Sequence, residues 1–118
     1  MSAETEFRAA LLAHAPLMAL MVSEARIAQN AAKDGIGTPC IVYGSTRIPD
    51  FHLDNSVGAT NVQFSVQCWG DTASIASAVA DAAVAALLAV STVCTSRSTT
   101  FDEELGLDGE ELVFDWWE

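Results

Sequence analysis

Basic residues are scarce in this chain. Lys and Arg together number 5 among 118 residues, against 16 Asp and Glu, and the formal net charge is −11. Such a field repels phosphate backbones and anionic membrane surfaces, and few cations are present to displace counterions from a nucleic acid. The composition therefore argues against a protein that grips DNA, RNA or an anionic bilayer. It is compatible with a protein that lies near DNA without holding it.

Long hydrophobic runs are also lacking. The longest run, Ile75–Val90, is interrupted by Ser77 and Asp81 and falls short of the ~20 apolar residues that span a bilayer. The N-terminus carries Glu4 and Glu6 where a secretory signal would need a basic region. We therefore expect the chain to stay in water, away from membranes.

Cysteine is present at only three positions, Cys40, Cys68 and Cys94, without a CxxC spacing. All three lie in apolar, strand-like runs, so we expect reduced thiols packed as small hydrophobic groups and folding in a cytosolic compartment. A thiol paired with His14 or His52 would be a nucleophile and its base. A reactive thiol needs an accessible, electropositive setting, and this acidic chain favours core packing instead.

The clearest pattern lies in Thr60–Val90. Within Val62–Trp69, apolar and mostly polar residues alternate with the period of a half-buried strand. Gly70 breaks the alternation, and Asp71 or Thr72 can cap a following helix. The helix residues expected to face the core, at spacings of three and four, are Ile75, Val79, Ala82, Ala83, Ala86, Leu87 and Val90.

The rest of the chain predicts one domain, residues 1–118, of the α+β class. Asp108-Gly109 is a hairpin signal, because Gly tolerates the positive φ that such turns require. The other expected elements are a helix from Ser2 that breaks at His14-Ala15, a short helix Pro16–Val22, and strands Arg26–Gln29, Pro39–Ile48, Val93–Phe101 and Glu111–Trp117. The order is α-β-β-β-α-β-β, which predicts a mixed, mostly antiparallel β-sheet with two helices packed on one face.

One segment carries the pattern of a metal site. Asp50, His52 and Asp54 alternate, so an extended segment would project all three to one side as N and O ligands. A solvated loop anchored by the intervening Phe51 and Leu53 is favoured, because a full ligand set and a second nearby His are missing.

An acidic run near the C-terminus invites a calcium site. It fails the calcium-loop pattern, since Gly106 and Leu107 stand where the fifth ligand and the required Gly should be. A solvated hairpin that resists edge pairing is favoured. Its carboxylates are Asp102, Glu103, Glu104, Asp108, Glu110 and Glu111. We expect no catalytic residues, metal or cofactor.

Two features indicate a protein partner. Val84 and Leu88 make the second half of the Ala-rich helix apolar nearly all round, as expected if a neighbouring chain covers it. Trp69, Trp117 and Tyr43 are large aromatics on strands, a residue type enriched at interface centres. A second covering layer within the same chain is the alternative. The candidate contact residues are Val84, Leu88, Trp69, Trp117, Phe51 and Leu53.

The whole layout resembles the tail completion, or tail terminator, proteins of long-tailed bacteriophages and related prophages. The strongest resemblance is the strand Val62–Trp69 followed by Gly70, Asp71 and an Ala-rich helix. The other resembling segments are Phe7–Leu12, Arg26-Ile27, Pro39–Tyr43 and Phe114-Asp115-Trp116-Trp117. The segment Asn30–Gly37 departs from the pattern.

The resemblance implies a structural, non-enzymatic virion protein at the head–tail junction, assembled in the host cytoplasm. Such proteins form a ring, typically a hexamer, that caps the head-proximal end of the tail tube, terminates its polymerisation and joins it to the head-completion or neck protein. DNA passes through the ring without specific binding, so the acidic hairpin is expected to face the lumen. The alternatives are another neck ring, such as a head-closure or adaptor protein, and a small cytosolic enzyme or metal-binding module around Asp50, His52 and Asp54.

Overall fold

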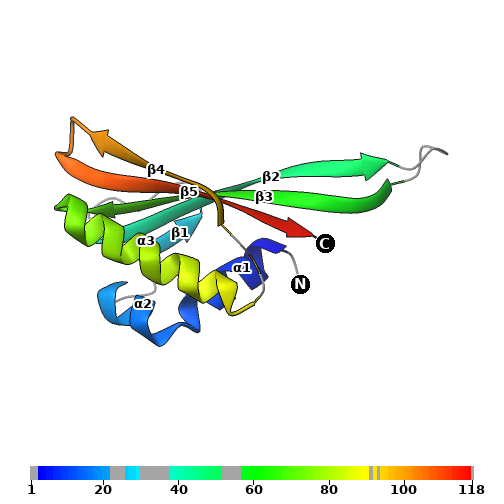
Figure 1. The fold of residues 1–118 in the computed structure, drawn as a ribbon, viewed down its shortest axis with the longest axis horizontal. Coiled ribbons are helices and arrows are strands. Elements are labelled where there is room, and N and C mark those ends of the chain that lie inside the picture. The colour runs from blue at the N-terminus through cyan, green and yellow to red at the C-terminus, as the bar shows by residue number, and fades with distance from the viewer. Residues whose placement is uncertain are drawn as a thin grey trace.

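A computed structural model describes residues 3–21, 26–29, 38–51, 57–90, 92 and 94–117, with the backbone alone at 48–51, 57–60 and 117. It shows a five-stranded sheet with helices on one face (Figure 1). The elements are α1 (Ala3–Leu12), α2 (Ala15–Met21), β1 (Ile27–Gln29), β2 (Cys40–Phe51), β3 (Val57–Gly70), α3 (Ala73–Leu88), β4 (Cys94–Asp102) and β5 (Leu107–Trp117). The predicted class and order are confirmed, and the predicted break in the first helix separates α1 from α2.

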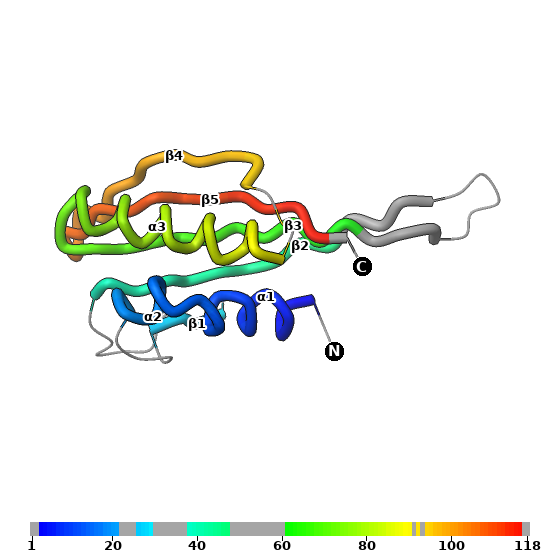
Figure 2. The backbone as a smooth tube through the Cα atoms, turned by 60° about the horizontal axis from the view of Figure 1, so that its bottom comes forward, coloured from blue at the N-terminus to red at the C-terminus, as the bar shows by residue number. Residues whose placement is uncertain are grey.

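The strand order is β1-β2-β3-β5-β4, and only the short pair β1–β2 is parallel. Figure 2 shows β4 and β1 at opposite edges of the sheet. The β2–β3 pairing continues to Phe51 and Val57, whereas β5 stops beside β3 at Asn61. The two strands β2 and β3 therefore extend beyond the others as a two-stranded arm.

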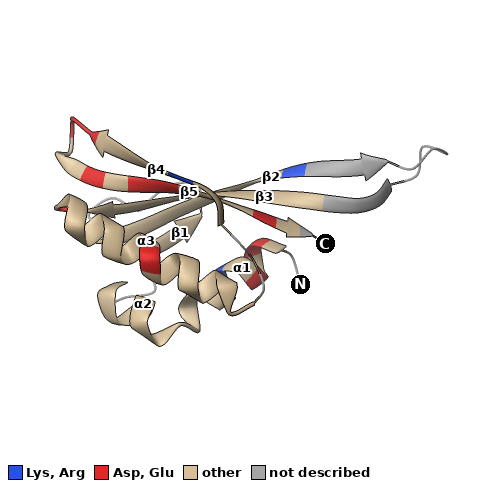
Figure 3. Ribbon diagram, viewed as in Figure 1, with Lys and Arg blue, Asp and Glu red and all other residues tan. Residues whose placement is uncertain are grey.

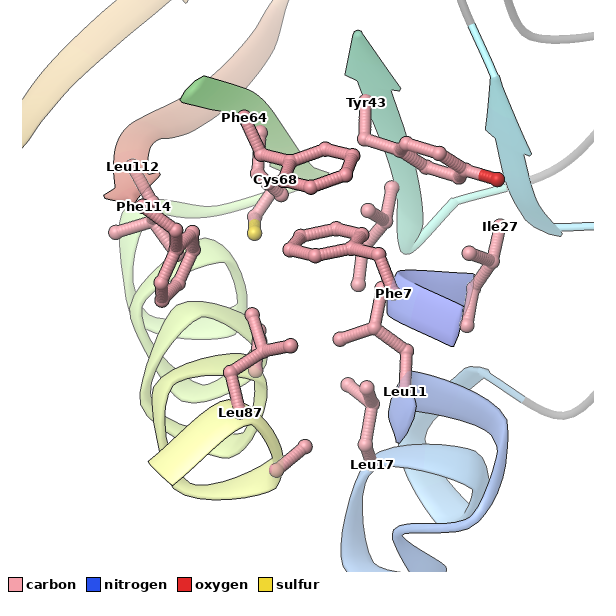
Figure 4. Packing of buried hydrophobic residues seen from close by; sticks show 14 of the residues in the cluster. Phe7, Leu11, Leu17, Ile27, Tyr43, Phe64, Cys68, Leu87, Leu112 and Phe114 are labelled. Carbon is pink, nitrogen blue, oxygen red and sulfur yellow. The ribbon is translucent and has the colours of Figure 1, made fainter. Parts of the chain in front are cut away.

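The core lies between the sheet and the helices (Figure 4). The alternating apolar residues of β3, Val62 to Cys68, are fully buried, as predicted. Phe7 and Leu11 of α1 lie four residues apart and so share one face of the helix, which packs on this strand. The ring of Phe7 stacks on that of Phe64, with centroids 3.9 Å apart. This stack fixes α1 on the centre of the sheet.

Helix α3 begins where β3 ends. Thr72, one of the two predicted caps, occupies the N-cap, and its hydroxyl oxygen accepts a hydrogen bond from the Ile75 N–H at 3.2 Å. Ile75 and Val90 were predicted to face the core but are exposed, so these two predictions were wrong. Ala76 and Ala80 are part of the buried face instead. Val90 lies beyond the helix end at Leu88, and Ile75 sits in the first turn, at the end of the sheet. The buried residues of α3 are Ala76, Val79, Ala80, Ala83, Ala86 and Leu87.

The turn between β4 and β5 lies earlier than predicted. Residues 103–106 form it, and Asp108-Gly109 lies within β5, so the hairpin assignment at that dipeptide was wrong. Gly106 adopts the positive φ, 65°, that the turn requires. Gly109 has another role, because a Cβ there would lie 2.7 Å from the ring of Trp69. The indole packs directly on the backbone of β5 at this point.

Candidate interaction surfaces

The six carboxylates of the predicted acidic hairpin do not form one surface. Glu103 and Glu104 are exposed in the turn, and Asp102 and Asp108 flank it half-buried. Figure 3 shows acidic residues gathered at this end of the molecule. Glu110 is buried, so the expectation that it would be solvated was wrong. Strand geometry is the reason: Glu110 pairs with Cys68 and so faces the helices.

Glu110 belongs to an internal ion-pair network centred on Arg97 of β4. The Arg97 Nε and Nη2 donate to the two carboxylate oxygens of Glu110 at 2.6 and 3.0 Å, and Nη1 donates to Asp81 of α3 at 2.7 Å. Nη2 also donates to the Ser77 hydroxyl oxygen at 3.3 Å. The hydrogen bonds to Glu110 and then Asp81 raise the pKa of Arg97 above its ordinary value. The network ties the edge strand β4 to α3.

Glu111 lies on the opposite face of the sheet, which none of the described helices covers and which we call the uncovered face. Its Oε1 accepts a hydrogen bond from the Ser65 hydroxyl at 3.3 Å. The alternation of β3 places Gln63, Ser65, Gln67 and Trp69 on this face. The β3 residues on the uncovered face are polar except for Trp69 at one end, and Val42 of β2 and Val113 of β5 lie beside them.

The predicted apolar helix face is partly available to a partner. Val84 is half-buried and packs against the core, whereas Leu88 is 60% exposed. Val90, two residues past Leu88, is 47% exposed and adds apolar surface that the sequence assigned to the core. The accessible part of this face is thus Leu88, and Val90 is a further exposed apolar residue past the C-terminal end of α3.

The aromatic candidates differ in their surroundings. Trp69 is half-buried on the uncovered sheet face, over Gly109. Tyr43, grouped with the partner-facing aromatics, is buried beside Phe7, with ring centroids 5.4 Å apart, so that assignment was wrong. Its place on β2 directs it toward the helices. For Trp117 and Phe51 the structure describes the backbone alone, and Leu53 lies outside the described residues.

Exposed apolar side chains also gather where the sequence predicted none. Phe101 at the end of β4, Leu105 in the β4–β5 turn and Ile75 in the first turn of α3 are all exposed. Leu105, an apolar residue inside an acidic turn, is the feature of the sequence that indicates this surface.

The described residues do not assemble a metal site, and two of the three thiols, Cys40 and Cys68, are buried, whereas Cys94 is half-buried. No cluster of three His, Cys, Asp or Glu that could hold a metal occurs among them; His52 and Asp54 lie outside this part of the chain, as does the side chain of Asp50. Burial, reinforced by the negative charge of Glu110, raises the pKa of the Cys68 thiol to about 12. Burial also raises the pKa of Cys40. These thiols are packing groups at neutral pH.

A depression of about 350 Å³ lies between α1 and the β1–β2 edge. The Arg47 Nη2 pairs with Glu4 Oε2 at 3.0 Å, and the Ser45 hydroxyl donates to Glu4 Oε1 at 2.9 Å. The Arg8 Nε donates to the Ile27 carbonyl oxygen at 3.4 Å. The charged groups around this depression are thus engaged within the chain. Its lining residues are Glu4, Thr5, Arg8, Ala9, Leu12, Gln29 and Tyr43.

None of the helices in the described ranges combines the length and the apolarity that crossing a bilayer would take. Exposed apolar or charged side chains lie at the Leu88 end of α3, on the uncovered sheet face, and at the β4–β5 hairpin end.

The comparison with solved structures finds a chain from the virion of a native gene transfer agent particle. The two folds superpose with a TM-score of 0.64 over 92% of this chain and 88% of that one, at 16% sequence identity. This likeness shows a shared fold.

No curated protein sequence matches the chain. The family model described as "Tail completion protein gp17" matches residues 5–117. The match takes in every helix and strand except the first two residues of α1, and the chain therefore belongs to the tail completion protein gp17 family.

Proposed function

We propose that this chain is a structural protein of a phage-like virion that forms a ring on the head-proximal end of the tail tube. The ring ends polymerisation of the tube and joins the tail to the head. The observation that carries the proposal is the family match over residues 5–117. A fold shared with a chain of a gene transfer agent virion supports a place in the particle.

The charge distribution supports passage of DNA through the ring without binding. Four Arg side chains are described, and each hydrogen-bonds within the chain: Arg8 to a carbonyl of β1, Arg26 to the Thr38 carbonyl at 3.0 Å, Arg47 to Glu4, and Arg97 to Glu110. Cations engaged in this way are poor partners for phosphates. An acidic ring would form few ion pairs with the phosphates of DNA, so DNA would leave the particle without being held by it.

The proposed contact between copies is the end of α3. Leu88 and Val90 expose apolar surface, and half-buried Val84 lies one helical turn before Leu88. A neutral apolar contact suits self-association of so acidic a chain, because it brings no carboxylates together. Trp69 on the uncovered sheet face is a second candidate contact.

Deleting the gene from the virus or prophage that encodes the chain tests the proposal. We expect overlong or unstable tails in electron micrographs, because nothing stops tube polymerisation. Complete tails of normal length beside tailless heads would instead identify a head-closure or adaptor ring. Normal particles would overturn both assignments.

The contact between copies has its own test. Leu88→Asp leaves the core intact, because this side chain is mostly exposed, and should give a folded monomer in light scattering or native mass spectrometry in the presence of tail tubes. Leu20→Asp, at an exposed position on α2, is the matched control and should still assemble. Rings that form equally well with Leu88→Asp would rule out this contact.

A further inference from the structure

The turn from β4 into β5 lies at the same end of the molecule as the start of α3 (Figure 1). Three large apolar side chains of these segments are exposed. Leu105 is 70% exposed, Phe101 55% and Ile75 39%. We call these three residues the tip surface. Single exposed apolar residues are common on proteins, but a group at one end marks an interaction site.

The strand register places Phe101 and Ile75 on the same face of the sheet. Phe101 pairs with Asp108, which pairs with Gly70, and a Cβ at Gly70 would lie 2.8 Å from Ile75 Cγ2. Thr100 points to the opposite face, toward Gly109, so Phe101 points to the face that carries the helices. Two strand spacings of about 5 Å separate the backbones of Gly70 and Phe101. Phe101 and Ile75 therefore lie on the same face at this end of the molecule, with Asp108 of β5 between them.

The turn that presents Leu105 is held by hydrogen bonds within the chain. The Asp102 Oδ1 accepts from the backbone N–H groups of Glu104 and Leu105, at 3.0 and 3.1 Å. The Gly106 N–H donates to the Asp102 carbonyl oxygen at 2.8 Å. A turn already fixed in one shape loses little conformational entropy on binding. Leu105 is thus a pre-positioned anchor.

The tip surface is bordered by carboxylates. The nearest Arg along β4, Arg97, is already engaged by Glu110 and Asp81. Asp108 lies between Phe101 and Ile75, and the carboxylates around the tip surface are Asp71, Asp102, Glu103 and Glu104. An acidic border around apolar anchors is complementary to an apolar pocket edged by Lys and Arg.

We propose that the tip surface docks onto a different protein of the particle, at an apolar pocket bordered by basic side chains. A second copy of this chain is a poor occupant, because it would bring carboxylates against carboxylates and has no described Arg outside an internal hydrogen bond. A water-filled lumen is also a poor surrounding, since it would leave Phe101 and Leu105 exposed to solvent. The inference rests on the proposed function, which supplies the partners: the tail tube and the head-proximal neck.

The experiment measures binding of the labelled chain to two probes from the virus that encodes it: tails and DNA-filled heads, each purified from particles assembled without the chain. The tip variant is Phe101→Ser/Leu105→Ser. The single variant Leu105→Ser is measured as well, in case the double variant does not fold, because Leu105 is exposed in the turn and its loss leaves the core unchanged. Leu20→Ser is the matched control for loss of an exposed leucine. Circular dichroism confirms that each variant is folded.

Wild-type chain should bind one of the two probes with an affinity that falls as salt rises from about 50 to about 300 mM. The tip variant should bind that probe roughly tenfold or more weakly, whereas Leu20→Ser binds as wild type. Glu103→Gln/Glu104→Gln should reduce the salt dependence, because it removes two of the border charges.

Tip variants that bind both probes as tightly as wild type would overturn the docking inference and leave the proposed function standing. Normal binding together with altered DNA ejection would place the tip at the lumen and also overturn it. If wild-type chain binds neither probe, the proposed function fails and the inference fails with it.

Discussion

Phe7 of α1 and Phe64 of β3 stack nearly parallel, with ring centroids 3.9 Å apart and planes inclined by 10°. Tyr43, Phe114 and Trp116 surround the pair, at centroid distances from Phe7 of 5.4, 5.9 and 6.3 Å. The first helix is thus joined to β2, β3 and β5 through one aromatic side chain. Figure 4 shows Phe7 pointing from α1 into the space between the sheet and α3.

Phe7→Ala should lower the free energy of unfolding by about 3–5 kcal/mol, because it leaves a cavity at the centre of this aromatic cluster. The matched control is Phe101→Ala, the same change at an exposed position, which should cost less than about 1 kcal/mol. Urea unfolding followed by circular dichroism measures both. Equal losses for the two variants would contradict the packing role of Phe7.

Arg97→Met should destabilise the fold by roughly 2–3 kcal/mol, because it leaves the buried carboxylate of Glu110 without its cation. Arg47→Met, at the more exposed pair with Glu4, should cost no more than about 1 kcal/mol. Pairing Arg97→Met with Glu110→Leu should recover much of the loss, since no buried charge remains. Thermal unfolding compares the stability of the wild type, the two single variants and the double variant. If the double variant recovers no stability, the pair acts through more than its charges.

Glu4 should make the fold sensitive to acid. A hydrogen bond from its own backbone, then the Ser45 hydroxyl and the Arg47 charge, hold the pKa of Glu4 below its ordinary value of 4.5, against a smaller opposing effect of burial. A lowered folded-state pKa contributes stability above the unfolded-state pKa, and the contribution disappears as the pH falls through the folded-state value. The stability advantage of wild type over Glu4→Gln should therefore be full near neutral pH and shrink below about pH 4.5. The urea concentration at the midpoint of unfolding, measured over this pH range, reports the difference in stability. Glu6→Gln, on the exposed side of α1, is the control. A pH-independent difference would exclude the linkage.

Two glycines of the β4–β5 hairpin should respond differently to alanine. Gly109→Ala places a methyl group 2.7–2.8 Å from Cε3 and Cζ3 of Trp69, so the indole must move. We expect a loss of about 1–3 kcal/mol and a shift in tryptophan emission. Gly106→Ala meets no atom within 4 Å but keeps a φ of +65°. It should cost about 1–2 kcal/mol through backbone strain, with unchanged emission, and Gly106→Asn should recover part of the loss. An unchanged emission spectrum in Gly109→Ala would mean that the ring does not rest on β5.

Much of the fold follows from local patterns. The alternation in Val62–Cys68 predicted the buried face of β3, because successive side chains of a strand point to opposite sides. Thr72 began α3 because a hydroxyl can satisfy a free N–H of the first turn, and Pro16 marked the second helix because its ring suits a first turn. These effects act within a few residues and need no knowledge of the partner strands.

Other features depend on which segments meet. The sequence by itself determined the strand-and-helix order, the acidic charge and the resemblance to a family whose model matches residues 5–117. Tertiary structure decided that Gly109 makes room for Trp69 rather than forming a turn, and that Glu110 is buried against Arg97 rather than solvated. It also decided that Phe101 and Ile75 lie on the same face at one end of the molecule. The physical reason is that register across β3, β5 and β4 sets these neighbours, and register depends on pairing between segments far apart in the chain.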